Sequence, residues 1–262
     1  MGLKRTLRRW ASYLRLGNYI KYRKDLANYV AQCADGAQFR YESKNAFPIL
    51  GEWNKEAGDL DDHYFFQDIW MARQIAASGV KHVHDIGSRV DGYIAHLLSM
   101  GVEVTMIDVR PLKRTIAGLH FVQADATSLE SIADASLSAL SSLHALEHFG
   151  LGRYGDPVDY LGWKKALRAM TRKVQPGGHL YLSVPVGREE KLMFNAHRIF
   201  SPLSIVRETE DAMATSCFAL VHGGEVSEWR FAAGDDVKAK LASDALPRLG
   251  GYDCGMFVLR KK

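Results

Sequence analysis

Short runs of mostly apolar residues recur along the chain. Between them lie stretches in which apolar residues are spaced three or four positions apart. Five such runs are each followed by a polar residue, glycine or proline: 83–86, 102–107, 119–122, 137–143 and 179–184. Runs of this length and composition are typical of strands buried on both faces of a sheet. Two later runs, 217–221 and 256–259, predict two further strands. Strands that are repeatedly followed by a helix or a loop predict an α/β fold with a mostly parallel sheet.

Apolar residues at intervals of three and four predict helices between these strands. The predicted helices cover 63–78, 93–100, 128–134, a run that ends at 174, and a segment that begins at Ser201-Pro202. Gly79 and Gly101 follow two of these helices, in a position where glycine commonly ends a helix. Gln175-Pro176-Gly177-Gly178 predicts a turn before the strand at 179–184.

The helix predicted over 63–78 lies next to a loop-rich connector, 36–60. Asp61-Asp62 is its predicted N-cap. Its core face is predicted from the spacing of Phe65, Ile69, Ala72 and Ala76. His63 and Tyr64 fall in its first turn, where they either close over a ligand or form a capped surface turn.

The N-terminal region is basic and amphipathic. Residues 1–24 contain eight Lys or Arg and no acid, so that the rest of a chain of net charge +4 carries a net charge of −4. Leu3, Leu7, Trp10 and Leu14 share one helical face, and Gly17-Asn18 predicts the end of this helix. The helix either binds an anionic membrane surface through residues 1–18 or packs on the domain or on a second subunit. We expect residues 1–35 to be a helical extension and 36–262 to be one α/β domain.

Composition excludes several classes of protein. With 262 residues, 47% of them hydrophobic, the chain is long enough to bury a full core. Cys33, Cys217 and Cys254 lie far apart, which favours reduced thiols and a cytoplasmic setting over a disulfide framework. No apolar run is long enough to span a bilayer, and nothing near the N-terminus has the apolar core of a signal peptide. The acidic main domain carries no broad signature of nucleic-acid binding.

A strand, a glycine turn and a helix at 82–100 form a unit that commonly binds nucleotides. Gly87 begins the turn, and Asp108 ends the next strand about 20 residues later, where a carboxylate suits both hydroxyls of a ribose. Arg89 and Asp91 stand where an adenosyl-binding loop has its second and third glycines. The turn alone is equally compatible with a plain connection between strand and helix. A nicotinamide-dependent oxidoreductase is disfavoured because the Gly-x-Gly-x-x-Gly fingerprint is missing.

Motifs along residues 85–185 resemble those of the class I S-adenosylmethionine-dependent methyltransferases. They are Asp85-Ile86-Gly87, Asp108, Asp125, Leu146-Glu147-His148 and Pro176-Gly177-Gly178. The resemblance implies a Rossmann-like, doubly wound, seven-stranded sheet with S-adenosylmethionine as cofactor. The cofactor contacts that it implies are Asp85, Gly87, Ser88, Asp108, Asp125 with Ala126, and Leu143 with His144. Arg89 is a candidate for pairing with the cofactor carboxylate.

A narrower resemblance covers about residues 47–202. It rests on His63-Tyr64 and on the segments 87–92, 147–156 and 194–198. These are similar to a methyltransferase-like family of poorly defined function that is associated with bacterial surface-polysaccharide synthesis. The resemblance implies O-methylation of a sugar in a polysaccharide such as lipopolysaccharide, or in its lipid-linked precursor, at the inner face of the plasma membrane. A non-catalytic scaffold in a glycan-synthesis complex is the alternative, and a homo-oligomer is compatible with both.

A sugar hydroxyl needs a general base, and histidine is the side chain most easily tuned for this near neutral pH. His148, just after the fourth strand, is the first candidate, and His197 is the second. Glu147 or Asp156 either orients the imidazole or acts as the base, although a structural role is equally compatible with each. The candidates for binding a glycan or a phosphate-bearing carrier are Arg153, Tyr154, Asn195 and Arg198. His144-x-x-Glu147-His148 also matches a zinc-peptidase pattern, which requires a long helix, and we expect no metal.

Overall fold

The structure is a computed structural model, and it describes residues 2–33, 39–50, 63–242, 246, 249 and 252–262. The chain divides into two compact units, residues 1–59 and 60–262. In the described residues, no helix combines the length and apolarity needed to cross a bilayer.

The first unit is built on one helix, α1 (Gly2–Gln32). The predicted helix end at Gly17-Asn18 is wrong, since α1 continues through both residues. A glycine inside a helix costs only about 1 kcal/mol, which the flanking helical turns can offset. The segment 39–50, which contains the short 3₁₀ helix η1 (Ser43–Asn45), is hydrogen-bonded to α1. The Asn18 amide donates to the Leu50 carbonyl, and the Tyr29 hydroxyl donates to the Phe39 carbonyl.

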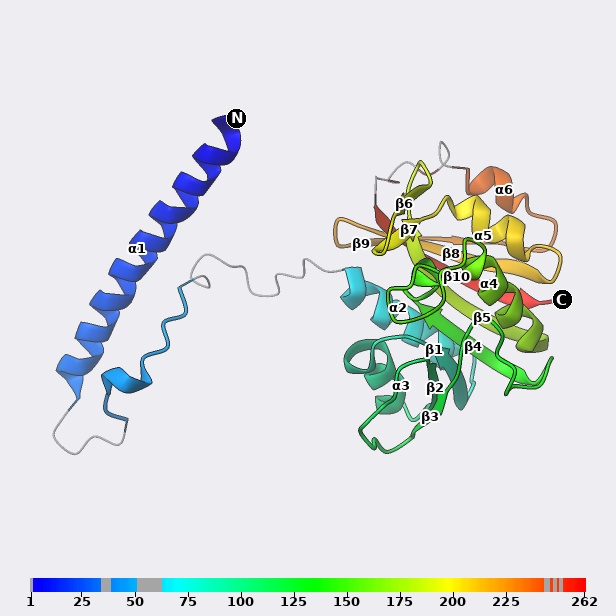
Figure 1. Ribbon diagram of the computed structural model, residues 1–262, viewed down its shortest axis with the longest axis horizontal. Coiled ribbons are helices and arrows are strands. Elements are labelled where there is room, and N and C mark those ends of the chain that lie inside the picture. Colours follow the sequence, from blue (N-terminus) through cyan, green and yellow to red (C-terminus); the bar gives the residue numbers. More distant parts are fainter. Residues whose placement is uncertain (1, 34–38, 51–62, 243–245, 247–248, 250–251) are drawn as a thin grey trace. The chain divides into compact units, whose positions relative to one another are not determined.

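The second unit contains an eight-stranded sheet in the order β3-β2-β1-β4-β5-β10-β8-β9 (Figure 1). Strands β1 to β5 are parallel, while β10 is antiparallel to both of its neighbours, and β8 pairs antiparallel with β9. The strands are β1 (His82–Ile86), β2 (Glu103–Asp108), β3 (Leu119–Gln123), β4 (Leu137–Leu143), β5 (Val174–Val186), β8 (Met213–His222), β9 (Glu225–Arg230) and β10 (Asp253–Lys261). A separate hairpin pairs β6 (Lys191–Met193) with β7 (His197–Ile199).

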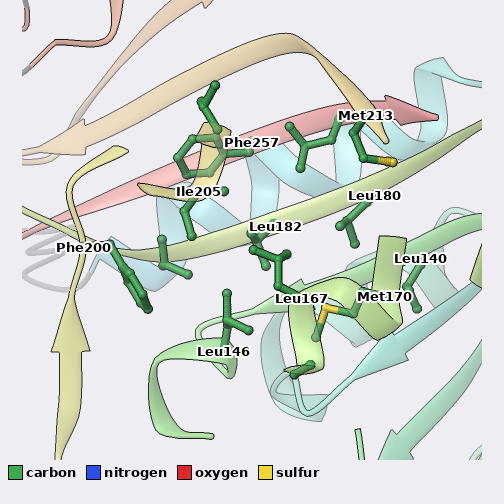
Figure 2. Packing of buried hydrophobic residues seen from close by; sticks show 14 of the residues in the cluster. Leu140, Leu146, Leu167, Met170, Leu180, Leu182, Phe200, Ile205, Met213 and Phe257 are labelled. Atoms are coloured by element: carbon green, nitrogen blue, oxygen red, sulfur yellow. The ribbon is translucent and has the colours of Figure 1, made fainter. Parts of the chain in front are cut away.

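Helices pack on both faces of the sheet, as the doubly wound α/β class requires. On one face, α4 (Gly162–Lys173) and α5 (Pro202–Thr209) join β4, β5 and β10 in a core that includes Leu167, Met170 and Phe257 (Figure 2). On the other face, α2 (His63–Ala77) and α3 (Ala95–Ser99) pack against β1, β2 and β10. The predicted fold class is therefore confirmed. The edge strand β9 adds an eighth strand to the predicted seven, and a short helix, α6 (Val237–Lys240), follows it.

Two local predictions are wrong. Residues 128–134 form turns instead of a helix, and Leu129 and Ala135 adopt the left-handed conformation, with φ of 50° and 52°. Residues 175–178 form an irregular part of β5 instead of a separate turn, since Leu137 pairs with Val174 while Ala139 pairs with His179. The extra residues on β5 between these pairs bulge out of the ladder.

Helix α2 buries a face that matches the predicted one only in part. Ala72 is buried as predicted, but Phe65 is 43% exposed, and the other buried residues are Gln67, Asp68, Met71 and Ile75. The helix can bury two polar residues because they are paired: the Gln67 amide nitrogen donates to Asp68 Oδ1, and Gln67 Oε1 accepts from the Ser183 hydroxyl. The predicted N-cap Asp61-Asp62 lies outside the described residues.

Candidate active site

The glycine turn after β1 is stabilised by a buried carboxylate at the end of that strand. Asp85 Oδ1 accepts hydrogen bonds from the Ser141 and Ser88 hydroxyls at 2.6 and 2.7 Å, and Oδ2 accepts from the Ser88 N–H at 3.0 Å. Burial raises the pKa of Asp85 to about 6, against the lowering effect of these hydrogen bonds. Asp85 is fully buried and lines neither cavity described below, so it supports the turn instead of reaching a ligand.

Gly87 allows the turn to approach the loop after β4. Its φ is +69°, which favours glycine, and a Cβ there would lie 3.1 Å from that of Ala145. The turn continues into a π-helix, η2 (Val90–Ile94), and then into α3. A Cβ on Gly92 would lie within 2.1 Å of Asp68 Oδ2. Any other residue at this position would force the Asp68 carboxylate to move.

A small cavity of about 120 Å³ lies between the ends of β1, β2 and β3. Gly87, Ile107, Ala126 and Phe149 contribute apolar wall, and Asp108 and Asp125 contribute carboxylates; His144 and His148 also line it. Asp125 Oδ1 accepts from the backbone N–H and the hydroxyl of Thr127, both at 2.8 Å.

Asp108 is bound by an arginine that sequence analysis did not single out. Its Oδ1 accepts from the backbone N–H and Nε of Arg110 at 2.8 and 3.0 Å, and its Oδ2 accepts from Arg110 Nη2 at 2.7 Å. The Arg110 guanidinium also lies over the Tyr154 ring, 4.5 Å from its centroid. A ribose that binds Asp108 must therefore replace or share these hydrogen bonds.

A larger cavity of about 540 Å³ adjoins the first, and both are lined by Gly87, Arg110, His144, His148 and Tyr154. Arg89 and Asp91 lie on its wall, where Arg89 Nε and Nη2 donate to the two Asp91 oxygens at 3.2 and 3.1 Å. The Arg89 guanidinium lies over the ring of Tyr64, whose side chain also lines this cavity. Ser88 and Leu143 contribute to the same wall.

A buried group of charged residues follows β4. His144 Nδ1 and Glu147 Oε1 are 3.0 Å apart, and His148 Nε2 is 3.6 Å from the same oxygen. Burial alone would lower the pKa of His144, but the Glu147 carboxylate and the Cys254 thiol raise it to about 10. Burial works to raise the pKa of Glu147, and His144 outweighs it, so that this pKa is lowered. His144 and Glu147 are therefore a buried ion pair at neutral pH.

His148 is held in one orientation by the turn of the β6–β7 hairpin. Its Nδ1 is 2.7 Å from the Ala196 carbonyl oxygen. Because a carbonyl only accepts, Nδ1 carries the proton, and Nε2 is the basic atom of the neutral ring. Burial lowers the pKa of His148 and the Arg153 charge adds to this, although Glu147 opposes it. At neutral pH the ring is mostly neutral, as a general base must be.

Glu147 and Asp156 have different environments. Glu147 lies beside His148 on the 3₁₀ turn η3 (Leu146–His148) and is buried. The Asp156 carboxylate instead accepts from the backbone N–H groups of Gly150, Gly152 and Tyr154, at 2.9, 3.3 and 3.1 Å. It organises the loop after η3 and makes no hydrogen bond to an imidazole among the described residues.

The remaining candidates are divided between the cavity and its supports. His197, Arg153 and Tyr154 line the larger cavity. Arg198 donates to the Phe149 carbonyl at 2.7 Å and to the Glu147 carbonyl at 3.3 Å, so it joins β7 to η3. Asn195 is exposed in the hairpin turn with φ of 62° and lines neither cavity, so its site there is structural.

Three supporting groups could not have been found from the sequence pattern. Ala196 acts through its backbone carbonyl, which leaves no trace in its side chain. Gln67 and Ser183 form a buried link beneath the site, since the Ser183 hydroxyl also accepts from the His144 N–H at 3.2 Å. Polar residues at helix positions next to an apolar stripe are a weak signal for this kind of network.

The arrangement does not match a metalloprotease. His144 has φ of 50°, so the His-x-x-Glu-His segment leaves the strand through a bend instead of lying on a long helix. In the part of the chain that the structure describes, no group of three or more His, Cys, Asp or Glu is arranged to hold a metal ion.

Comparisons with known proteins identify the fold. A family model described as "Caenorhabditis protein of unknown function, DUF268" matches residues 102–218, and no curated protein matches the sequence. The chain is 14% identical to the N-methyltransferase NodS from Bradyrhizobium japonicum WM9 in complex with S-adenosyl-L-homocysteine, over 77% of this chain and 89% of NodS, with a TM-score of 0.52. It is 16% identical to a Burkholderia thailandensis 1,6-didemethyltoxoflavin-N1-methyltransferase (77% and 80% covered, TM-score 0.50). The fold is that of the class I methyltransferases.

The same fold is shared by a protein that is named as a cyclase. The [4+2]-cyclase SpnF is 16% identical over 74% of this chain and 80% of its own, with a TM-score of 0.52. The fold therefore does not determine the reaction. Both cavities lie at the ends of the parallel strands beside β1 and β4, where the strand order reverses and where α/β sheets bind ligands. The matched family has no stated function, so the link to surface-polysaccharide synthesis stays a prediction.

Proposed function

We propose that the protein is an S-adenosylmethionine-dependent O-methyltransferase. The observation that carries this proposal is the position of His148. Its ring is oriented by Ala196 so that Nε2 is the basic atom, and it lies where the two cavities meet. A neutral imidazole beside a cavity suits removal of a proton from an acceptor hydroxyl.

We expect the small cavity to hold the adenosyl group. Its apolar wall suits an adenine ring, Asp108 would bind the ribose hydroxyls, and Asp125 with Ala126 would bind the adenine edge. Arg89 is exposed on the wall of the larger cavity and would bind the carboxylate of the methionine half in place of Asp91, to which it now donates. When bound, the cofactor supplies a methyl group that is already activated for transfer.

The residues of the chain then have two tasks. The walls of the larger cavity hold an acceptor hydroxyl close to the methyl group. His148 Nε2 would take the hydroxyl proton while the methyl group passes from the sulfonium sulfur of the cofactor to the hydroxyl oxygen, and Glu147, 3.6 Å away, would stabilise the resulting imidazolium. His197, on the same wall, is the second candidate for the base.

The proposed acceptor is a sugar of a surface polysaccharide or of its lipid-linked precursor, at the cytoplasmic face of the membrane. This proposal is supported by the resemblance of the segments 87–92, 147–156 and 194–198 to a polysaccharide-associated family. It is also supported by the polar larger cavity, whose side chains include Arg153, Tyr154 and His197. Rings and guanidinium groups of this kind suit a polar ring-shaped ligand.

A non-catalytic scaffold is the second candidate. It is favoured by the contact between Arg110 and Asp108, which occupies the carboxylate proposed for the ribose. It is also favoured by Arg89 and Asp91, which stand at loop positions where adenosyl-binding loops have glycine.

Titration calorimetry with S-adenosylmethionine, S-adenosylhomocysteine and NAD separates these candidates. We expect both adenosyl ligands to bind and NAD not to bind. Asp108→Asn should weaken binding of S-adenosylhomocysteine by about tenfold or more, because charge-assisted hydrogen bonds to the ribose are lost. The exposed Asp134→Asn is the matched control. Absence of heat with both adenosyl ligands would leave the scaffold as the better account.

The base is tested by transfer of a labelled methyl group to lipid-linked glycans extracted from bacterial membranes. His148→Gln should slow transfer by about 10²–10⁴-fold while binding of S-adenosylhomocysteine is retained. The exposed His120→Gln serves as the control. Unchanged transfer in His148→Gln would exclude His148 as the base.

A further inference from the structure

Arg153 carries a charge that the described residues do not compensate. Its guanidinium lines the larger cavity, where Nη1 donates to the Ala196 carbonyl at 2.8 Å and lies 3.4 Å from His148 Nδ1. It also lies 5.3 Å from the centroid of the Tyr154 ring. Among the residues that the structure describes, no carboxylate forms a salt bridge with it.

The other arginines of this cavity differ in this respect. Arg89 forms a two-pronged contact with Asp91, and Arg110 forms one with Asp108. The other carboxylate that lines this cavity, that of Glu147, is paired with His144. Arg153 is exposed, and its other donors make no hydrogen bond to the described residues, so they are available to a ligand in the cavity.

We propose that the larger cavity takes an acceptor that carries a phosphate or diphosphate group, and that Arg153 binds this group beside His148. The inference rests on the proposed methyl transfer and specifies the chemical class of its acceptor. A planar guanidinium matches the oxygens of a phosphate through two parallel hydrogen bonds. The aromatic ring of Tyr154 beside it leaves the donor edge of the guanidinium accessible.

Binding at Arg153 also affects the proposed base. The groups that face His148 are Glu147 on its own turn, His144 at the end of β4, Arg153 and Tyr154 on the following loop, and the Ala196 carbonyl of the hairpin. Of these, Arg153 and His144 act to lower the pKa of His148. An anion bound to Arg153 offsets one of these positive charges, so that the pKa of His148 rises. Binding of the phosphate-bearing acceptor therefore makes His148 more basic, and His148 is the group proposed to take the proton of that acceptor.

The test is calorimetry with inorganic pyrophosphate on the full chain saturated with S-adenosylhomocysteine, at constant ionic strength. We expect Arg153→Gln to weaken pyrophosphate binding by about tenfold or more, as expected for loss of a charge-assisted, two-pronged contact. Arg73→Gln removes the same charge from an exposed position on α2 and should leave binding unchanged. Saturation with S-adenosylhomocysteine fills the place of the cofactor carboxylate, which is the other anion that this cavity would take.

The coupling to His148 is tested by NMR titration of its imidazole. Pyrophosphate should raise the pKa of His148 in the wild-type chain and leave it unchanged in Arg153→Gln. Retained binding of S-adenosylhomocysteine by Arg153→Gln shows that the adenosyl site, and with it the proposed function, is intact. The inference is overturned if pyrophosphate does not bind, if it competes with S-adenosylhomocysteine, or if Arg153→Gln and Arg73→Gln weaken it equally.

Discussion

Asp85 is a single buried carboxyl group whose effect on stability depends on pH. Its pKa is raised by burial to about 6, from an ordinary value of 3.8. The folded state thus holds this proton more tightly than the unfolded chain does. Its contribution to stability is therefore present below about pH 4 and is lost as pH rises to about 6.

Asp85→Asn should remove this pH dependence. An asparagine can accept from the Ser88 N–H and donate to a serine hydroxyl, so the turn after β1 keeps its support. Relative to the wild-type chain, the variant should gain on the order of 3 kcal/mol between pH 4 and pH 7. Urea unfolding at four pH values measures this difference. If the free energy of unfolding changes with pH in the same way in both proteins, ionisation of Asp85 does not destabilise the folded state.

His144 and Glu147 illustrate a second effect at the scale of residues. His144→Ala leaves the Glu147 carboxylate buried without its partner, which should destabilise the protein by about 3–5 kcal/mol. The double variant with Glu147→Gln should recover most of this loss, because no uncompensated charge remains. Denaturant unfolding of both single variants and the double variant gives the coupling energy. Additive losses would mean that the two side chains do not form an ion pair in the fold.

At the scale of elements, the loop between η3 and α4 has its closest backbone approach at a glycine. Gly150 has φ of +75°, and a Cβ there would lie 2.0 Å from the Asp159 carbonyl oxygen. Gly155, in the same loop, has φ of +84° with nothing within 4 Å of a Cβ. Gly155→Ala should therefore cost about 1–2 kcal/mol through the left-handed backbone alone.

Gly150→Ala adds a collision with backbone to this conformational cost, and we expect it to cost clearly more than Gly155→Ala. It should also disturb Leu151 and Arg153 and hence weaken anything bound beside His148. Thermal unfolding of both variants and NMR of the His148 ring measure the two effects. Equal losses of stability in the pair would mean that the loop can move Asp159 without cost.

The elements that were predicted correctly have signals that lie within a few residues. Strands β1, β2, β4 and β10 are short apolar runs, and Gly79 and Gly101 end helices with φ of 76° and 73°. Edge strand β9 was missed because its residues are mostly exposed and polar, so that its position is set by pairing with β8. The face of α2 was misjudged because it buries polar residues that pair with the sheet.

The candidate site was predictable in its location and only partly in its contacts. Strand ends place Asp108, Asp125, His144 and His148 around the two cavities, as the order of elements implies. The sequence does not reveal that the Asp156 carboxylate accepts hydrogen bonds from backbone N–H groups. Nor does it reveal that a backbone carbonyl orients His148. In both contacts the partner is a backbone group, which any residue type can provide, so the sequence carries no signal for it.

At the scale of the whole molecule, charge is divided between the two units. The basic residues of 1–24 belong to the first unit, whereas the proposed site lies wholly within 60–262. The hydrogen bonds between α1 and residues 39–50 also lie within the first unit. The second unit contains both cores and the complete sheet. We therefore expect the second unit to fold and to form the site without the N-terminal region, whose expected role is binding to an anionic membrane surface.

Removal of residues 1–59 should leave the thermal unfolding temperature and the affinity for S-adenosylhomocysteine unchanged. The same removal should abolish binding to vesicles that contain phosphatidylglycerol, since the eight basic residues are lost. Binding by the full chain should fall as salt is raised and should be absent with neutral phosphatidylcholine vesicles. Arg8→Gln with Arg9→Gln keeps the length of the chain and should give an intermediate result.

The alternative is that α1 packs on the domain or on a second copy of the chain. In that case, the truncated protein would unfold at a lower temperature or would change its mass in light scattering, and vesicle binding by the full chain would not depend on lipid charge. A helix that buries its apolar face against protein gains stability in proportion to the area it covers, whereas a helix that binds a membrane leaves the stability of the domain unaffected. Vesicle sedimentation, calorimetry and light scattering on the same two proteins therefore distinguish the roles of the N-terminus.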